Sequence, residues 1–345
     1  MEIHLVAILS IKSFEGTDEI IKYVFSKNVF EFPIFETTYP AMIIDNKFIE
    51  NLGDKEQKYF EKIYKYEDQE PIIIMSSFNI PPPNEEIKSS VGDGPINVNS
   101  KEYQNINEFI AEDTFRKRIL DLIISFNLSF CGGINIVEGR LFRNGKLVNN
   151  YNVIYNDLEF GKQLSIKVGW PTLTNLPLNQ TFNWLMNFKN DMDNISNSRI
   201  GRAVNAFTYL FHDSFLYEDD LSDLLWSLVG LESIYTDGNT DLQNQLDYKS
   251  QLLLGERKEF KKVVKNMYEY RSKYVHGKLN FASRFSGKDT TDFIEKFSPE
   301  LSEASNTAIS TFTATLQHFV KNNITDINFL RTYNYEITTS KIKNE

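Results

Sequence analysis

The spacing of the apolar residues changes near position 196, and this change limits the folds that the chain can adopt. Earlier segments such as His4–Ile11 and Phe30–Phe35 are short, rich in β-branched and aromatic residues, and typical of strands. Later segments repeat an apolar residue every three or four positions, which is the period of one helix face. We therefore predict an α+β protein with a mixed α/β N-terminal domain at residues 1–195, an all-α helical bundle at 196–335 and a tail at 336–345.

The clearest local pattern in the first part is a β-hairpin. The apolar segments Ile134–Phe142 and Leu147–Tyr155 flank the pair Asn144-Gly145. Asn-Gly favours the positive φ angles of a type I′ turn. The same part is expected to hold a helix that carries Ile119, Leu122, Ile123 and Phe126, and further strands at Pro71–Met75 and Leu164–Val168.

Four helices are expected in the second part, and each has one apolar face. They cover Arg199–Phe211, a segment that starts at Asp220, residues from about 258 to 276, and a long segment that begins at Pro299, where proline suits the first turn. The faces are, in the same order, Ile200, Val204, Phe207 and Phe211; Leu221, Leu225 and Leu228; Phe260, Val264, Met267 and Tyr274; and Leu301, Ser305, Ala308, Phe312, Leu316 and Phe319. Helices of this kind bury their faces against one another, so we expect a bundle.

Two charged residues extend these apolar faces. Glu232 follows Leu228 by four residues, and Arg271 follows Met267 by four, so each lies one helical turn beyond an apolar position. Burying either charge alone is costly, and a Glu232–Arg271 pair would relieve both costs. Such a pair is either purely structural or holds the guanidinium ready to bind a phosphate.

His276 lies five residues after Arg271 and directly before Gly277. A histidine can take up and release a proton near neutral pH, so Arg271 and His276 together could cleave a phosphodiester without a metal. The two side chains diverge by about 140° on an unbroken helix, however. Either Gly277 ends the helix and lets His276 turn, or two copies of the chain meet across a two-fold axis; a third interpretation is that His276 only caps the helix.

The overall composition excludes some classes of protein. A net charge of -10 argues against broad, sequence-independent coating of nucleic acid, although the stretch from Arg257 to Lys278 is locally basic. The single cysteine, Cys131, leaves no internal disulfide and no zinc site built from cysteines. No apolar run approaches the ~20 residues of a membrane span, and the N-terminus lacks a basic leader. We therefore expect a cytoplasmic protein that uses no membrane, metal or cofactor.

Two segments resemble a known family. Leu224–Tyr235 reads LLWSLVGLESIY and Tyr268–Gly277 reads YEYRSKYVHG. Both are similar to the ApeA-like branch of the HEPN domains, and the resemblance covers residues 196 to 325. It implies a metal-independent endoribonuclease of antiviral defence or toxin systems that acts on RNA as a homodimer. Arg271 and His276 match the paired catalytic positions of that family.

The resemblance also implies supporting roles for neighbouring residues. Ser272 stands where the wider group often has Asn or Asp, and we expect Glu232, Ser272 and Lys273 to support the site. Lys273 and Lys278 are expected to hold the RNA backbone. An activating ligand or a phage component is expected to act on the N-terminal domain. The alternative function is a non-catalytic helical dimerisation module that binds RNA or protein, and a third interpretation is a purely structural dimerisation domain.

Overall fold

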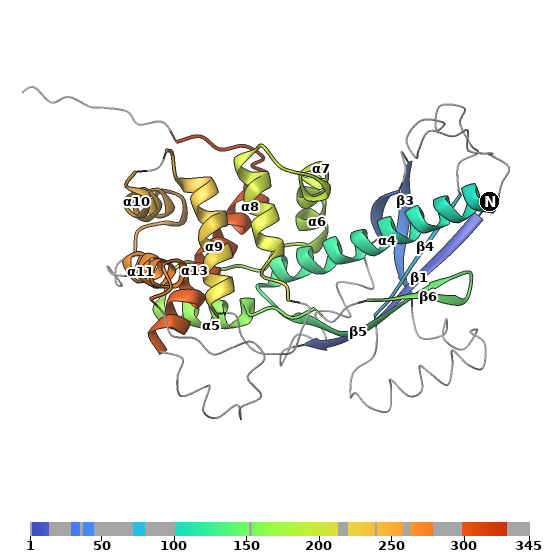
Figure 1. Ribbon diagram of the computed structural model, residues 1–345, viewed down its shortest axis with the longest axis horizontal. Coiled ribbons are helices and arrows are strands. Elements are labelled where there is room, and N and C mark those ends of the chain that lie inside the picture. Colours follow the sequence, from blue (N-terminus) through green and yellow to red (C-terminus); the bar gives the residue numbers. More distant parts are fainter. Residues whose placement is uncertain are drawn as a thin grey trace, which may run out of the picture.

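The computed structural model describes residues 2–13, 29–34, 37–44, 72–79, 101–151, 154–212, 220–238, 240–257, 263–278 and 299–329. An antiparallel sheet lies at one end of the molecule and a group of helices at the other, and the long helix α4 (Lys101–Phe130) runs from the sheet into the helices (Figure 1). The predicted combination of α and β structure is therefore confirmed.

The sheet has six described strands in the order β2-β3-β4-β1-β5-β6, and neighbouring strands are antiparallel. Asn144 and Gly145 have φ angles of 48° and 77°, which confirms the predicted hairpin between the last two strands. The sequence pattern does not predict β3, because Pro40 interrupts it. The strand bounds are β1 Glu2–Ser13, β2 Val29–Ile34, β3 Thr37–Ile44, β4 Ile72–Asn79, β5 Ile134–Arg143 and β6 Lys146–Tyr151.

One face of the sheet packs against α4. Every second residue at the start of β1 lies on this face, as the two-residue period of a strand requires, and these residues are fully buried: Ile3, Leu5, Ala7 and Leu9. They share a hydrophobic cluster with the α4 side chains Ala111, Phe115, Ile119, Leu122, Ile123 and Phe126. The predicted helix face in this segment is thus confirmed.

The helical part follows the hairpin. Its described helices are α5 (Leu158–Val168), α6 (Leu178–Met186), α7 (Lys189–Asp193), α8 (Arg199–Thr208), α9 (Asp220–Tyr235), α10 (Leu242–Leu254), α11 (Val263–Val275) and α13 (Pro299–Asn322). The predicted starts of α8, α9 and α13 are confirmed, whereas α8 ends three residues earlier than predicted. Residues 258–262 of the third predicted helix lie outside the described residues, and the sequence pattern does not predict α6, α7 or α10.

None of the described helices combines the length and apolarity needed to cross a membrane.

The predicted strand at Leu164–Val168 is wrong, because these residues form the end of α5. Apolar and polar residues alternate here as they do in a strand, yet Ile166 is 72% exposed. The buried residues of α5 have helical spacing instead: Leu158, Gly161 and Ser165. Close packing against α13 decides the conformation, since a Cβ on Gly161 would lie 3.0 Å from Cγ2 of Ile309.

The C-terminal helix α13 is the centre of the helical part. Its predicted apolar face from Leu301 to Phe319 is confirmed as buried, and the burial extends around most of the helix. Hydroxyl groups on the other buried positions donate to backbone carbonyls within α13: Thr307, Ser310, Thr311 and Thr315. Such a helix, buried on most sides, occupies the middle of its core.

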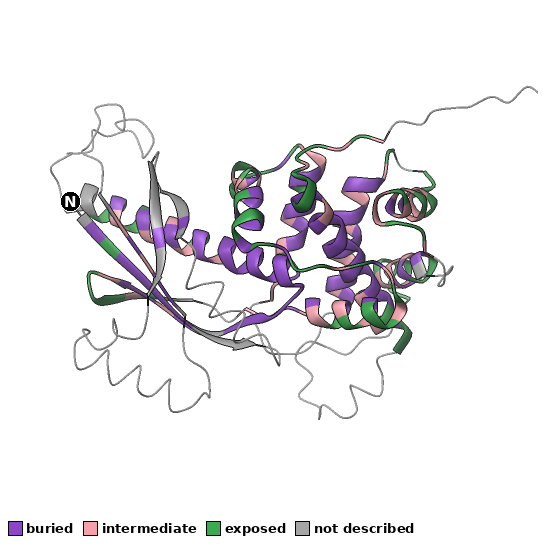
Figure 2. Cartoon of the chain, turned by 180° about the vertical axis from the view of Figure 1, so that it is seen from behind, coloured by how far each residue is buried: buried purple, intermediate pink, exposed green. Residues whose placement is uncertain are grey.

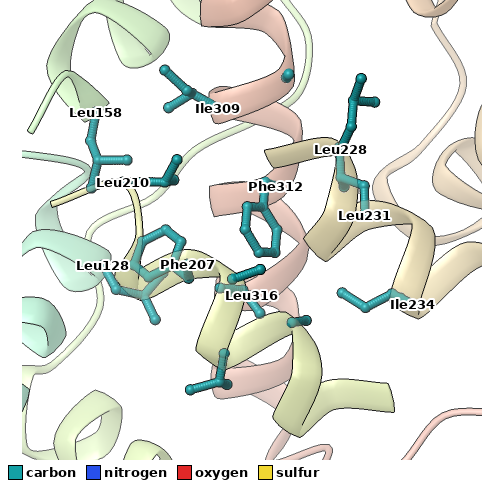
Figure 3. Packing of buried hydrophobic residues seen from close by; sticks show 14 of the residues in the cluster. Leu128, Leu158, Phe207, Leu210, Leu228, Leu231, Ile234, Ile309, Phe312 and Leu316 are labelled. Carbon is teal, nitrogen blue, oxygen red and sulfur yellow. The ribbon is translucent and has the colours of Figure 1, made fainter. Parts of the chain in front are cut away.

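Phe312 links α13 to two neighbouring helices. Figure 3 shows its ring between Phe207 of α8 and the leucines Leu228 and Leu231 of α9. The Phe207 and Phe312 rings meet edge to face, with centroids 5.5 Å apart. Gly230 of α9 leaves space for this ring, since a Cβ at that position would lie 2.1 Å from Phe312 Cζ.

The core of the helical part draws residues from both sides of position 195. Ile124 and Leu128 of α4, Leu158 of α5 and Trp184 of α6 belong to the same hydrophobic cluster as residues of α8, α9 and α13. Figure 2 shows buried residues continuing from α4 into the other helices. The domain limits at residues 195 and 335 stay a prediction.

Candidate functional site

The helix α11 ends as Gly277 predicts. Gly277 has a φ angle of 63°, the left-handed conformation that glycine adopts readily. The Lys278 amide donates to the Lys273 carbonyl at 2.7 Å, and the Gly277 amide donates to the Tyr274 carbonyl at 3.0 Å. These two bonds form a Schellman motif, in which His276 is the last residue before the glycine. The His276 side chain is exposed at this end of α11.

Arg271 and Glu232 form the pair that the sequence predicts. Nη2 of Arg271 lies 3.5 Å from Oε2 of Glu232, and the side chains are 33% and 16% exposed. The pair joins α11 to α9. Because a guanidinium carries five N–H groups and this contact uses one, Arg271 keeps donors for a phosphate.

The pair lies at the edge of the core and not inside it, which corrects the predicted α9 face. The buried side of α9 carries Leu221, Leu224, Leu228 and Leu231, whereas Leu225 is partly exposed. Glu232 directly follows this buried side. The pair is therefore within reach of solvent, as a site that binds an external phosphate requires.

Tyr268 completes a polar cluster with the ion pair. Burial raises the pKa of the Tyr268 hydroxyl, and the Glu232 carboxylate raises it further. The hydroxyl consequently stays protonated at neutral pH. Among the described residues, three buried polar atoms of the cluster have no hydrogen-bond partner of good geometry: Glu232 Oε1, Tyr268 Oη and Arg271 Nε. The cluster therefore has unused hydrogen-bonding capacity.

The other predicted site residues lie on the solvent side of α11. Lys273 pairs with Glu269 at 2.7 Å and lies 4.9 Å from the Tyr270 ring centroid. The Glu269 carboxylate raises the pKa of Lys273. Ser272 and Lys278 are exposed. Ser272, Lys273 and Lys278 are thus available to a ligand that approaches the end of α11, but within the described residues no side-chain hydrogen bond or ion pair joins any of them to Arg271.

His276 is not brought to the Arg271–Glu232 pair within one chain. In the part of the chain that the structure describes, no hydrogen bond or ion pair joins its ring to either residue. The helix stays regular through Val275, so the divergence of about 140° between Arg271 and His276 persists. A cleft that uses both side chains needs a second copy of the chain or a movement at Gly277.

A cleft of about 490 Å³ lies next to Glu232, and the sequence pattern does not predict it. It is formed between α8 and the end of α9, and its lining consists of Arg199, Arg202, Val229, Glu232, Ser233, Thr236, Asp237 and Gly238. Arg199 pairs with Asp237 and donates to the carbonyl of Ile234 at 3.2 Å. The sequence feature that could have indicated this cleft is the pair Arg199 and Arg202 near the start of α8.

Other candidate groups have structural partners. Nε2 of His212 lies 2.8 Å from Oδ1 of Asp223, and Nδ1 of His4 lies 2.6 Å from Oγ of Ser77. Cys131 is buried, which raises the pKa of its thiol to about 12. Over the described ranges, the structure groups no three His, Cys, Asp or Glu side chains in a way that could hold a metal ion.

Comparisons with family models, with curated proteins and with solved structures find no match for this chain. The resemblance to HEPN domains therefore stays a prediction from the residues that carry it.

Proposed function

We propose that this protein is a metal-independent endoribonuclease of the HEPN type, acting in the cytoplasm as a homodimer in defence or toxin-like RNA cleavage. The observation that carries the proposal is the Arg271–Glu232 contact, which holds a partly exposed guanidinium on α11, the helix that the exposed His276 directly follows. Arginine binds a phosphate through its planar set of N–H donors, and histidine moves protons near neutral pH.

The proposed reaction is an internal attack within the RNA. The 2′-hydroxyl oxygen forms a bond to the neighbouring phosphorus, and the bond from phosphorus to the 5′-oxygen breaks. His276 moves a proton, either from the 2′-hydroxyl as a base or to the 5′-oxygen as an acid. Arg271 stabilises the charge that develops on the phosphoryl oxygens, and Glu232 orients it. The products are a 2′,3′-cyclic phosphate and a 5′-hydroxyl.

The remaining parts of the proposal concern partners. Lys273 and Lys278 hold the RNA backbone from the exposed end of α11, and Ser272 supports the site. Residues 1–195, which include the sheet, receive an activating ligand or a phage component. The second candidate function is a non-catalytic RNA- or protein-binding dimerisation module, which the separation of His276 from Arg271 within one chain favours.

The proposal is tested by incubating the full chain with single-stranded RNA in excess EDTA. We expect cleavage with 2′,3′-cyclic phosphate ends, no cleavage of DNA of the same sequence, and loss of cleavage in Arg271→Ala and His276→Ala. His318→Asn is the matched control, because burial and Lys321 lower the pKa of His318 and leave it neutral. Full activity of His276→Ala, or a strict need for a divalent metal, would overturn the mechanism.

A further inference from the structure

A stacked aromatic pair lies on the surface between α8 and α9. Tyr209 directly follows α8, and Trp226 belongs to α9. Their ring centroids are 4.0 Å apart and the ring planes are within 12° of parallel, yet Tyr209 is 53% exposed. Trp226 covers one face of the tyrosine ring. A flat, exposed ring of this kind is the surface on which an unpaired nucleobase stacks.

The aromatic pair and the cleft beside Glu232 belong to one surface strip. Tyr209 lies seven residues after Arg202, and Trp226 lies seven residues before Ser233, so each aromatic residue is on the same helix face as a residue that lines the cleft. Seven residues of helix rise by about 10 Å. Neighbouring nucleotides of one strand can therefore reach both places.

The charges around the cleft suit a phosphate in spite of the acidic composition of the chain. The Asp237 carboxylate pairs with Arg199 and Lys249, and the Glu232 carboxylate pairs with Arg271. Each carboxylate that lines the cleft is therefore matched by at least one cation.

Arg202 adds a further positive charge to this surface. Its guanidinium is exposed and donates to the Asn197 carbonyl at 2.8 Å, and within the described residues no carboxylate lies at ion-pair distance from it. The cleft thus has a local excess of cations next to Arg271, which favours a polyanionic ligand.

We propose that this strip is a binding track for single-stranded RNA: an unpaired base stacks on the Tyr209–Trp226 pair, Arg202 binds the adjoining phosphate, and the strand continues past the cleft towards Arg271. The inference rests on the proposed function for the choice of RNA as the ligand. It adds residues of α8 and α9 that hold the strand, besides the exposed lysines at the end of α11.

The test measures binding apart from cleavage. The probe is a short single-stranded RNA with every 2′-hydroxyl methylated, so that it cannot be cut, added to the full chain in EDTA. We expect the probe to quench tryptophan fluorescence, and Trp226→Phe to remove the quenching while Trp170 and Trp184 remain. Tyr209→Ala should weaken binding about tenfold and Tyr209→Phe much less, because base stacking on an aromatic ring persists in the second variant.

Two further variants make the test specific. Arg202→Gln should weaken binding and lower the slope of log K against log salt by about one, as expected for one lost phosphate contact. Tyr248→Ala is the matched control, since Tyr248 is 66% exposed on α10, and α10 contributes no residue to the lining of the cleft. Double-stranded RNA should compete poorly, because its bases are already paired and stacked.

The outcomes separate this inference from the proposed function. If Tyr209→Ala binds as tightly as the Tyr248→Ala control, or if the duplex competes as well as the single strand, the track is overturned even where wild-type protein cleaves RNA. If binding depends on Tyr209 and Arg202 but natural RNA stays intact, the track stands and the ribonuclease proposal fails. Absence of binding to the probe overturns the track directly.

Discussion

Nη2 of Arg271 lies 3.5 Å from Oε2 of Glu232, and this contact joins α11 to α9 at the edge of the core. Both side chains keep some exposure, so the pair combines a fixed position with access to solvent. Tyr268 borders the same carboxylate. The stability and the activity of the protein should therefore respond together to changes at Glu232.

Replacing Glu232 by alanine should lower the free energy of unfolding by about 1–2 kcal/mol, because a partly buried guanidinium loses its partner. Removing one partner of a fully buried pair would cost about 3–5 kcal/mol of stability. The cost is smaller here because the Arg271 side chain is partly exposed. Urea unfolding measures the difference. Glu269→Ala, which removes the exposed partner of Lys273, is the control and should leave the transition unchanged. If Glu232→Ala and Glu269→Ala unfold at the same urea concentration, the Glu232–Arg271 contact contributes nothing to stability.

Gly230→Ala should destabilise the protein by about 1–3 kcal/mol, as overpacking of a core typically does. The added Cβ would lie 2.1 Å from Phe312 Cζ, and that ring is fully buried. The effect should shrink in a Phe312→Leu background, where the smaller side chain leaves room. A double-mutant cycle from thermal melts measures this coupling. Additive effects of the two substitutions would contradict the close approach of α9 and α13.

Stability should fall between pH 4 and pH 7 because of Asp121. Burial raises its pKa from 3.8 to about 7, against the opposing effect of the Arg118 guanidinium at 2.5 Å. A folded-state pKa above the unfolded value means that the folded protein binds the proton more tightly. The resulting stabilisation is present below about pH 4 and is lost as the pH rises through the folded pKa.

Asp121→Asn is the variant that isolates this effect, since an amide does not titrate. The melting temperature of the wild type minus that of Asp121→Asn should decrease as the pH increases from 4 to 7 and then level off. A difference that increases over this range would mean that the Arg118 charge outweighs burial.

The two-copy arrangement predicts complementation between inactive variants. Light scattering should first show a dimer at micromolar concentration. After subunit exchange between Arg271→Ala and His276→Ala proteins, a cleft that takes Arg271 from one copy and His276 from the other is restored in one half of each mixed dimer. Since mixed dimers are half of the population, about a quarter of the wild-type activity should return. A stable dimer without any recovery would place both groups in one chain.

Local patterns determined much of the secondary structure. The Asn144-Gly145 turn, the start of α13 at Pro299 and the end of α11 at Gly277 follow from the backbone preferences of these few residues. The apolar face of α13 is also visible in the sequence, because its period is that of a helix. Spacing likewise predicted that Glu232 and Arg271 would meet.

Packing between distant segments decided the rest. Leu164–Val168 alternates like a strand but is helical, because Gly161 lets α5 approach α13 closely. Leu224 is buried in place of Leu225, which places Glu232 at the edge of the core. The cleft with Arg199 and the stacked Tyr209–Trp226 pair arise only where α8 lies beside α9. The sequence by itself thus determined the elements and the chemistry of the site residues, whereas the tertiary structure decided which faces are buried and which side chains share a surface, since both depend on contacts between residues far apart in the chain.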